Sequence, residues 1–199
     1  MQTCSPSIAK GKTVKTSFET SSDIVECQMM TTGGHFPVYK DKLLQAVTMS
    51  YEDTEKIKGT FIMPYEQSLD DFIDTITDDT INTIITKSFN LSLIVSVPKF
   101  SSKNLINLKS TLLDMGFDNG DFSGMFEEEV NDDILDTLQK CVVDVDEEGT
   151  TGAVVTVKGG KHGAVKKMTF DKSFLFIVRH IDFPDQFLFV CKVEKPISK

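Results

Sequence analysis

Two apolar segments near the end of the chain constrain the fold more than any other feature. Residues 174–178 (FLFIV) and 187–193 (FLFVCKV) are apolar on both faces of an extended strand, so each should lie in a deeply buried sheet. The segment RHIDFPDQ that connects them has the length of a hairpin loop. The sequence therefore predicts an antiparallel pair of strands within a covered sheet.

Further strands are predicted from the alternation of apolar and polar residues and from prolines that end a strand. From residue 89 the apolar residues recur with period two until Pro98 ends the strand, and one face carries Phe89, Leu91, Leu93, Val95 and Val97. Residues 58–63 predict a strand that Pro64 stops, and residues 141–145 predict another. Residues 24–30 and 44–49 are short apolar runs, which the turn-rich segment TTGGHFPVYKDK separates.

Three helices are predicted between the strands. Ser68 and Asp71 have the spacing of a capping box, and the residues that follow Ser68 form one apolar face: Leu69, Phe72, Ile73 and Ile76. A second helix starts after Thr77 and turns Ile81, Ile84 and Ile85 inward. A third carries Leu105, Leu108 and Leu112 and ends at Gly116. The predicted class is α+β, rich in antiparallel sheet, after an irregular lead-in over residues 1–15.

Composition and charge exclude several classes of protein. The net charge of −9 and the dispersed lysines argue against a nucleic-acid partner, which a basic stripe would indicate. No run of about 18 apolar residues occurs, so no membrane span is predicted. The four cysteines lack metal or redox spacing and favour buried free thiols: Cys4, Cys27, Cys141 and Cys191.

Motifs for catalysis and cofactor binding are missing from the sequence as well. Residues 11–13 (GKT) lack the earlier glycine of a phosphate loop, because Pro6 stands at that position. Neither GxSxG nor HExxH occurs, and the three histidines lie in unrelated contexts. The acidic residues 127–129 and 132–133 lack the spacing of a calcium loop. We therefore expect no enzyme activity, no metal and no cofactor.

The stretch VDVDEEGTTGAVVTV, residues 143–157, has two interpretations. It begins as the end of a strand, passes through an acidic joint that contains Gly149, and continues with small and β-branched residues. On composition alone, residues 149–157 predict an ordinary buried strand. The other interpretation is a loop that is able to become a strand.

Six stretches between Thr16 and Pro196 occur in the order found in one known family. They are TSFETSSDIVECQMM, AVTMSYEDTEKIKGTFIMP, VSVPKF, LKSTLLDMGF with DFSGM, LQKCVVDVDEEGTTGAVVT, and FDKSFLFIVRH with FLFVCKVEKP. In these stretches the chain resembles the C-terminal half of a serpin, a serine protease inhibitor. It departs from the family at Ser50, where proline is usual, and between Gly116 and Phe122, where several residues are missing.

The resemblance implies a fold and a mechanism. The implied fold is a single serpin-like α+β domain over residues 16–199, with mixed, largely antiparallel sheets, helices and an exposed reactive-centre loop at about residues 147–169. The N-terminal half of the fold would be missing. The implied function is inhibition of serine endopeptidases, with cysteine endopeptidases as a further class of target. A protease cuts the loop, forms an acyl-enzyme and is trapped when the loop inserts into the central sheet.

Within the loop, the resemblance implies a hinge and a reactive-site bond. The hinge comprises Glu147, Glu148, Gly149, Thr150, Thr151, Gly152 and Ala153. Gly149 permits a sharp reversal, and no residue from there to 157 is bulky, charged or proline, so none should block insertion. Counting forward from Gly149 places the reactive-site bond at Gly163–Ala164, and counting back from Phe170 places it at His162–Gly163.

One ion pair is also implied by the resemblance. Lys99 of VSVPKF resembles the family lysine that pairs with the hinge glutamate, here Glu147. The other interpretation is two separate exposed charges, which would contribute little to stability.

The missing half leaves two functions open. The inserting loop needs neighbouring strands from both halves of the family's fold, so one half alone would have an exposed sheet edge that favours self-association. The alternative to a protease inhibitor is therefore a non-inhibitory serpin-like substrate, or a binding or decoy protein. The expected partner is a protease of the serine type. The resemblance implies an extracellular location, and the cytoplasm is the alternative because the N-terminus shows no signal-peptide pattern.

Overall fold

A computed structural model of the protein describes residues 13–51, 54–116, 138–146 and 166–196. The chain divides into two compact units, residues 1–101 with 144–199 and residues 102–143. The first described strand begins at Val14, inside the predicted lead-in. The predicted domain boundary at residue 16 and the predicted loop range 147–169 stay predictions.

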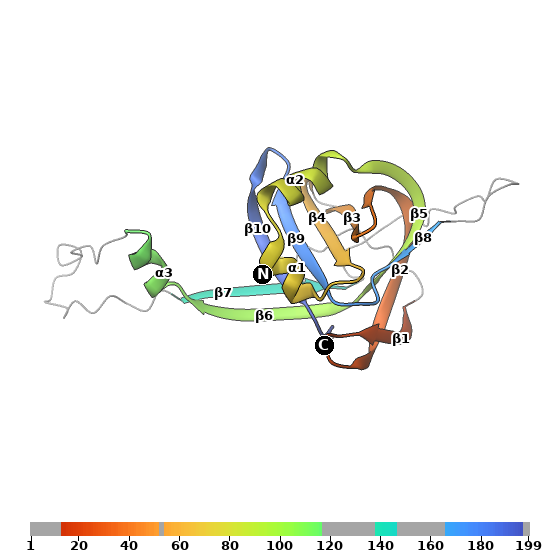
Figure 1. The fold of residues 1–199 in the computed structure, drawn as a ribbon, viewed down its shortest axis with the longest axis horizontal. Helices are drawn as coiled ribbons and strands as arrows, with labels where there is room; N and C mark the ends of the chain where they lie inside the picture. The colour runs from red at the N-terminus through yellow and green to blue at the C-terminus, as the bar shows by residue number, and fades with distance from the viewer. Residues whose placement is uncertain (1–12, 52–53, 117–137, 147–165, 197–199) are drawn as a thin grey trace, which may run out of the picture. The chain divides into compact units, whose positions relative to one another are not determined.

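The larger unit is built on one eight-stranded sheet (Figure 1). Its strands are β1 (Val14–Glu19), β2 (Ile24–Lys40), β3 (Leu44–Tyr51), β4 (Thr54–Pro64), β5 (Phe89–Pro98), β8 (Lys167–Thr169), β9 (Phe174–His180) and β10 (Phe183–Val193). They lie in the order β10-β9-β4-β3-β2-β5-β8, and β1 pairs with β2 outside this path. Every pair is antiparallel except β5 with β8. The predicted hairpin of β9 and β10 is confirmed, with His180 opposite Phe183.

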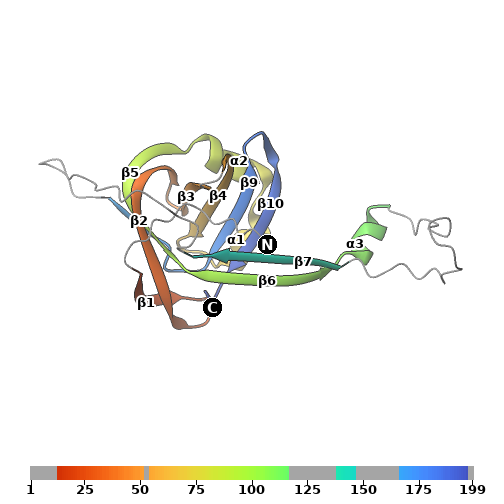
Figure 2. The ribbon, with the colours of Figure 1, turned by 180° about the vertical axis from the view of Figure 1, so that it is seen from behind.

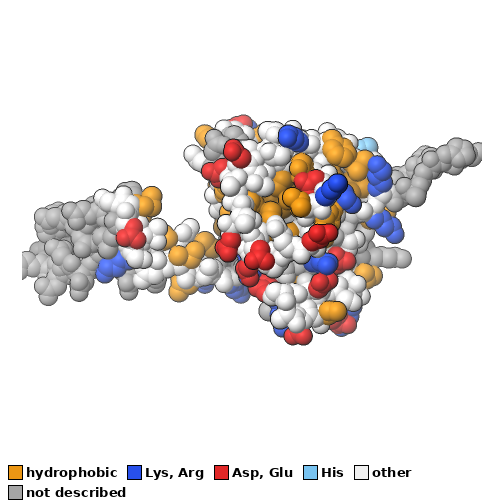
Figure 3. Space-filling view, viewed as in Figure 1, with side chains coloured by type: hydrophobic (Ala, Val, Ile, Leu, Met, Phe, Trp, Pro, Cys, Tyr) orange, Lys and Arg blue, Asp and Glu red, His pale blue; other side chains and the backbone are white. Residues whose placement is uncertain are grey.

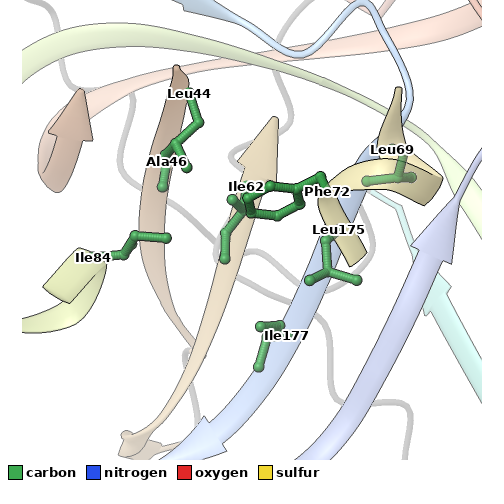
Figure 4. Close-up of a cluster of buried hydrophobic side chains, with 8 residues drawn as sticks. All are labelled: Leu44, Ala46, Ile62, Leu69, Phe72, Ile84, Leu175 and Ile177. Atoms are coloured by element: carbon green, nitrogen blue, oxygen red, sulfur yellow. The ribbon is translucent and has the colours of Figure 1, made fainter. Parts of the chain in front are cut away.

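Two short helices, α1 (Leu69–Thr75) and α2 (Asp78–Thr86), lie on one face of this sheet (Figure 1). The Ser68 hydroxyl accepts a hydrogen bond from the backbone N–H of Asp71, which confirms the predicted start of α1. Thr77 caps α2 in the same way through the N–H of Thr80. The buried side chains of both helices meet those of β3, β4 and β9 in one cluster (Figure 4), which comprises Leu44, Ala46, Ile62, Leu69, Phe72, Ile84, Leu175 and Ile177.

The other face of the sheet carries aromatic side chains. Phe61, Phe174 and Phe176 alternate with the aliphatic residues of the helix-covered face, so their rings point to the opposite side. The ring of Phe61 lies 4.6 Å from that of Phe176, centroid to centroid, and 5.8 Å from that of Phe174. With both faces packed, residues Phe174 to Arg179 of β9 are all buried, as the sequence predicts for residues 174–178.

The same prediction is wrong for β10. Leu188 and Val190 are 50% and 59% exposed, although Cys191 and Val193 are buried. β10 is the last strand of the sheet in the described part of the chain, where β9 is the only strand that pairs with it. An apolar strand at a sheet edge cannot be told from a central one by composition, because burial depends on what the neighbouring elements cover.

β2 also differs from the sequence prediction. The segment TTGGHFPVYKDK was expected to separate two short apolar runs, but all of it except the last two residues lies within β2, a single strand of 17 residues. Residues Met29 to Val38 of β2 pair with β5, from Pro98 back to Phe89. Taken by themselves, the two glycines and the proline predict a turn. This long antiparallel ladder instead gives the segment the backbone hydrogen bonds of a strand.

The face predicted for β5 is confirmed in part. Leu93, Val95 and Val97 are buried, but Phe89, the first residue of the strand, is 53% exposed. Alternation predicts the direction of a side chain, and not whether another element covers it.

The smaller unit contains α3 (Lys109–Asp114) and most of β6 (Phe100–Asn107) and β7 (Leu138–Val145). β6 and β7 pair as a separate two-stranded sheet, and Figure 2 shows them side by side. The predicted helix through Leu105 is wrong, because Leu105 lies in β6 and the helix begins at Lys109. Gly116, where the helix was predicted to stop, has φ of 83°, a left-handed conformation that glycine adopts without strain.

No helix within the described residues is long and apolar enough to cross a membrane. Cys27, Cys141 and Cys191 are free cysteines, as predicted, and Cys27 and Cys191 are buried. Burial, followed by the charges of Asp171 and Glu26, raises the pKa of the Cys27 thiol, so this thiol is protonated and unreactive at neutral pH.

Candidate functional site

Most residues of the predicted site lie outside the described part of the chain. This holds for the whole hinge, residues 147–153, and for both alternatives of the reactive-site bond, residues 162–164. The structure describes the chain on either side of residues 147–165. We call Val145 and Asp146 the N-terminal anchor, and residues 166–170 the C-terminal anchor.

The C-terminal anchor is held by backbone hydrogen bonds along β5. β8 pairs with β5 in parallel, with Lys167, Met168 and Thr169 opposite Ile94, Val95 and Ser96. The N–H of Ile94 donates to the carbonyl oxygen of Lys166 at 2.9 Å, and the N–H of Phe170 donates to that of Ser96 at 2.9 Å. The chain is thus fixed over residues 166–170.

A side chain from β3 adds a further hydrogen bond to this anchor. The amide Nε2 of Gln45 donates to the carbonyl oxygen of Thr169 at 2.7 Å, and its Oε1 accepts from the Tyr65 hydroxyl at 3.3 Å. Gln45 is only 6% exposed, so both ends of a buried amide are satisfied. Sequence reasoning missed Gln45, since no local pattern links it to a residue 124 positions away.

Buried side chains hold the C-terminal anchor to the aromatic face of the sheet. Met168 is 5% exposed and Phe170 is fully buried. The ring centroid of Phe170 lies 5.7 Å from that of Phe61 and 5.9 Å from that of Phe174. Burial of one phenylalanine stabilises a fold by about 1.5–3 kcal/mol, and aromatic pairs add about 0.5–1.5 kcal/mol. The anchor is therefore a stable part of the core.

The N-terminal anchor stands at the end of β7. Val145 is 1% exposed, so this end of the strand is also fixed by packing. Among the described residues, β6 is the only strand that pairs with β7. Within the described ranges, no strand pairs with the other edge of β7.

Lys99 lies between β5 and β6. Its backbone N–H donates to the carbonyl oxygen of Gln28 at 2.8 Å, which joins the start of β6 to β2. Its side chain is partly buried. The predicted partner Glu147 lies outside the described residues, so the Lys99–Glu147 ion pair stays a prediction.

The charged side chains of the C-terminal anchor are two lysines at its start. Both Lys166 and Lys167 are exposed. Within the described ranges, no group of three or more histidine, cysteine, aspartate or glutamate residues is placed to hold a metal ion. The described part of the predicted site therefore consists of two chain ends, each fixed by packing or by backbone hydrogen bonds.

Three comparisons with known proteins agree on one family. A family model described as serpin (serine protease inhibitor) matches residues 8–196. A serine proteinase inhibitor of Cavia porcellus is 28% identical over 182 residues, which are 88% of this chain and 44% of that protein. An alpha-1-antitrypsin homolog of Cyprinus carpio is 27% identical over 191 residues, 92% of this chain and 51% of that protein. The chain thus spans about half the length of the curated relatives it matches.

Solved structures have the same fold. Human thyroxine-binding globulin matches with a TM-score of 0.75 and 22% identity, over 98% of this chain and 53% of that chain. Native protease nexin-1 with heparin matches with a TM-score of 0.70 and 20% identity, over 98% and 53% of the two chains. At these identities the likeness is one of fold alone. The predicted serpin-like fold, mixed and mostly antiparallel and about half of the solved chains in extent, is confirmed.

Proposed function

Because the chain belongs to the serpin family and spans about half the length of its relatives, we propose that it is the loop-bearing part of an inhibitor of serine endopeptidases. The proposed reactive-centre loop is the segment at residues 147–169. The family description names an inhibitor and not a catalyst, so we assign no enzyme activity to the chain.

The observation that carries this proposal is the separate anchoring of the two ends of the loop. The described residues before the proposed loop end at Asp146, directly after β7. Those after it begin at Lys166, next to β8. β7 pairs with β6, whereas β8 pairs with β5 in the larger sheet. A cut between the two anchors would therefore leave one piece attached to β7 and the other attached to β8. The piece on β7 would be free to move without unfolding the core.

The proposed reaction begins as an ordinary proteolytic cut. The hydroxyl oxygen of the target's catalytic serine bonds to the carbonyl carbon of Gly163, and the bond from that carbon to the nitrogen of Ala164 breaks. The proton of the serine hydroxyl passes to that nitrogen, so the new amine stays on the piece held by β8, and the protease stays esterified to residue 163. With His162–Gly163 as the bond, the same steps move one residue back.

Insertion of the hinge would follow this cut. Residues 149–157 would add to the open edge of β7, beginning at the reversal at Gly149, and would gain a ladder of backbone hydrogen bonds. Insertion would carry the esterified protease away from the anchors before water hydrolyses the ester. The second neighbour of the inserted strand would come from the part of the family's length that this chain does not span.

A gel experiment with a matched pair of variants tests this proposal. The chain, supplied together with the N-terminal part of a related serpin as the second edge for insertion, is mixed with trypsin-like, elastase-like and chymotrypsin-like proteases and run on a gel after boiling in detergent. We expect a band at the summed mass for the natural chain and for Val154→Thr, since both residues suit a strand. The band should be missing for Val154→Lys, which would place a charge within the inserted strand. Cleavage between residues 158 and 167 without a stable band for any protease would contradict inhibition.

A second candidate function is a non-inhibitory serpin. The observation that favours it is the half-length of the chain, because a single half offers only one edge for insertion. The chain would then be a protease substrate, or a binding or decoy protein, or it would self-associate through its open sheet edge. Cleavage without trapping in the gel experiment would select this candidate.

We place the protein outside the cell by analogy with alpha-1-antitrypsin-like relatives, with the cytoplasm as the alternative. Detection of the chain in the medium of expressing cells, against a cytoplasmic marker, would decide between them.

A further inference from the structure

One motif of the chain is used neither by the fold nor by the proposed loop. Asn90, Leu91 and Ser92 form the sequence Asn-x-Ser, which is the acceptor for N-linked glycosylation when the middle residue is not proline. The motif occurs once in the 199 residues. Because so short a motif also arises by chance, the structure has to decide whether a glycan fits there.

The two polar side chains of the motif lie on one face of β5. Asn90 and Ser92 are exposed, and Leu91 between them is partly buried. Residues two apart in a strand point to the same face, so the amide and the hydroxyl face solvent together. Among the residues that the structure describes, neither side chain has a hydrogen-bond partner. A glycan on Asn90 would therefore break no side-chain hydrogen bond of the described fold.

The described neighbours of Asn90 leave space for a bulky group. Within the described ranges, β8 pairs with β5 only from Ile94 to Ser96, so Asn90 lies about 13 Å along the strand before that part. On its other side, Asn90 is opposite Pro37 of β2. β5 runs along the outside of the larger unit (Figures 1 and 2). A glycan would therefore project from β5 beside the C-terminal anchor and would replace none of the anchor's contacts.

The other interpretation of Asn90 is an ordinary polar residue at the surface. Figure 3 shows acidic and basic side chains interspersed over one face of the molecule, so charged residues already make the surface polar. Asparagine is depleted in strands, because its side chain competes for backbone hydrogen bonds. What favours a modification site is the hydroxyl of Ser92, which lies on the same face as the amide and is exposed as well.

We propose that Asn90 carries an N-linked glycan. The sugar comes from an oligosaccharide that is joined to a lipid through a diphosphate. The Nδ2 of Asn90 bonds to the first sugar carbon, the bond from that carbon to the diphosphate oxygen breaks, and the lipid diphosphate leaves. One amide proton passes to a base of the transferase. The inference rests on the proposed location outside the cell, because only a chain that enters the secretory pathway meets this transferase.

Enzymatic removal of the glycan tests this assignment. The chain is expressed in cultured mammalian cells behind a cleavable signal peptide, so that its entry into the secretory pathway does not depend on the proposed location. Peptide N-glycosidase hydrolyses the bond between Cγ and Nδ2 of Asn90, which releases the glycan and leaves aspartate. We expect digestion to lower the mass of the chain, and mass spectrometry to find aspartate at position 90. An unchanged mass with an unmodified Asn90 would overturn the assignment.

Four variants separate the motif from effects on folding. Asn90→Gln and Ser92→Ala should each abolish the loss of mass on digestion, whereas Ser92→Thr should keep it, because threonine restores the hydroxyl of the motif. Asn82→Gln is the matched control and should keep the glycan, since Asn82 is exposed in α2 and lies outside any such motif. A glycan that persists in Asn90→Gln would refute the proposal.

Failure of this inference can be told from failure of the proposed inhibition. A chain without a glycan would leave the proposed trapping of a protease untouched, because the gel experiment depends on the loop alone. Cleavage without trapping would in turn leave the mass difference on digestion unchanged.

Discussion

Replacement of Phe170 by alanine tests whether the end of the proposed loop is held by the core. Phe170 is fully buried, and its ring packs on the rings of Phe61 and Phe174 at 5.7 and 5.9 Å. Removal of a buried phenylalanine ring costs about 3–5 kcal/mol, because the lost transfer free energy adds to the cost of the cavity. With a urea m-value of about 2 kcal/mol/M, the unfolding midpoint should fall by about 1.5–2.5 M.

The assay is urea unfolding followed by far-ultraviolet circular dichroism, combined with trypsin digestion below the transition. The loss of packing should also free the C-terminal anchor, so cleavage after Lys166 and Lys167 should become faster. Phe89→Ala is the control, since Phe89 lies in the neighbouring strand β5 but is 53% exposed and should cost less than about 1 kcal/mol. A loss of less than about 1 kcal/mol in Phe170→Ala, or an equal loss in both variants, would refute the reasoning.

Three further predictions concern the fold. Gly59→Ala should lower the free energy of unfolding in urea by about 1–3 kcal/mol, because its new Cβ would lie 3.0 Å from the buried ring of Phe176. Gly34→Ala, whose new Cβ meets a partly buried ring, should cost less. The reverse order of the two costs would contradict the packing. Ser68→Ala should cost about 1 kcal/mol through loss of the α1 cap, and an unchanged midpoint would show that the cap is dispensable. Burial raises the pKa of Asp41, but hydrogen bonds from two backbone N–H groups and a tyrosine hydroxyl lower it further, so that it lies below the ordinary 3.8. The stability that the carboxylate contributes is fully present above a pH of about 3.9 and is lost as the pH falls through the lower folded-state pKa. On acidification below about pH 4, Asp41→Asn should therefore lose less stability than the natural chain, and parallel pH curves would contradict this.

Local elements were predictable where their cause lies within a few residues. The helix after Ser68 follows from a cap and an apolar face that are neighbours in sequence, and both are confirmed. The opposite case is Leu105, whose spacing to Leu108 and Leu112 suits a helix. It lies in β6 because β7, more than 30 residues further along, supplies a partner strand. Periodicity alone cannot weigh a distant partner against a local helix.

The same distinction between local patterns and distant contacts applies to the candidate site. The order of its motifs, through their resemblance to a family, indicated the segment between β7 and β8 and its predicted hinge. It did not indicate what holds the ends, because Gln45 and Thr169 meet across 124 positions of the chain. The burial of Arg179 was equally invisible in the sequence, since the burial of a single arginine depends on the elements that pack against it.

The sequence by itself determined the family, the fold class, two helices with their caps and the strand β9. These depend on motif order, on capping and on an apolar pattern strong enough to suit burial on both faces. Only the tertiary structure decided that β2 runs on through two glycines and a proline, that Leu188 and Val190 of β10 are exposed, and that the two ends of the proposed loop are held in different sheets. The physical reason is that strand pairing and burial are set by residues far apart in the chain, whose contacts no local pattern records.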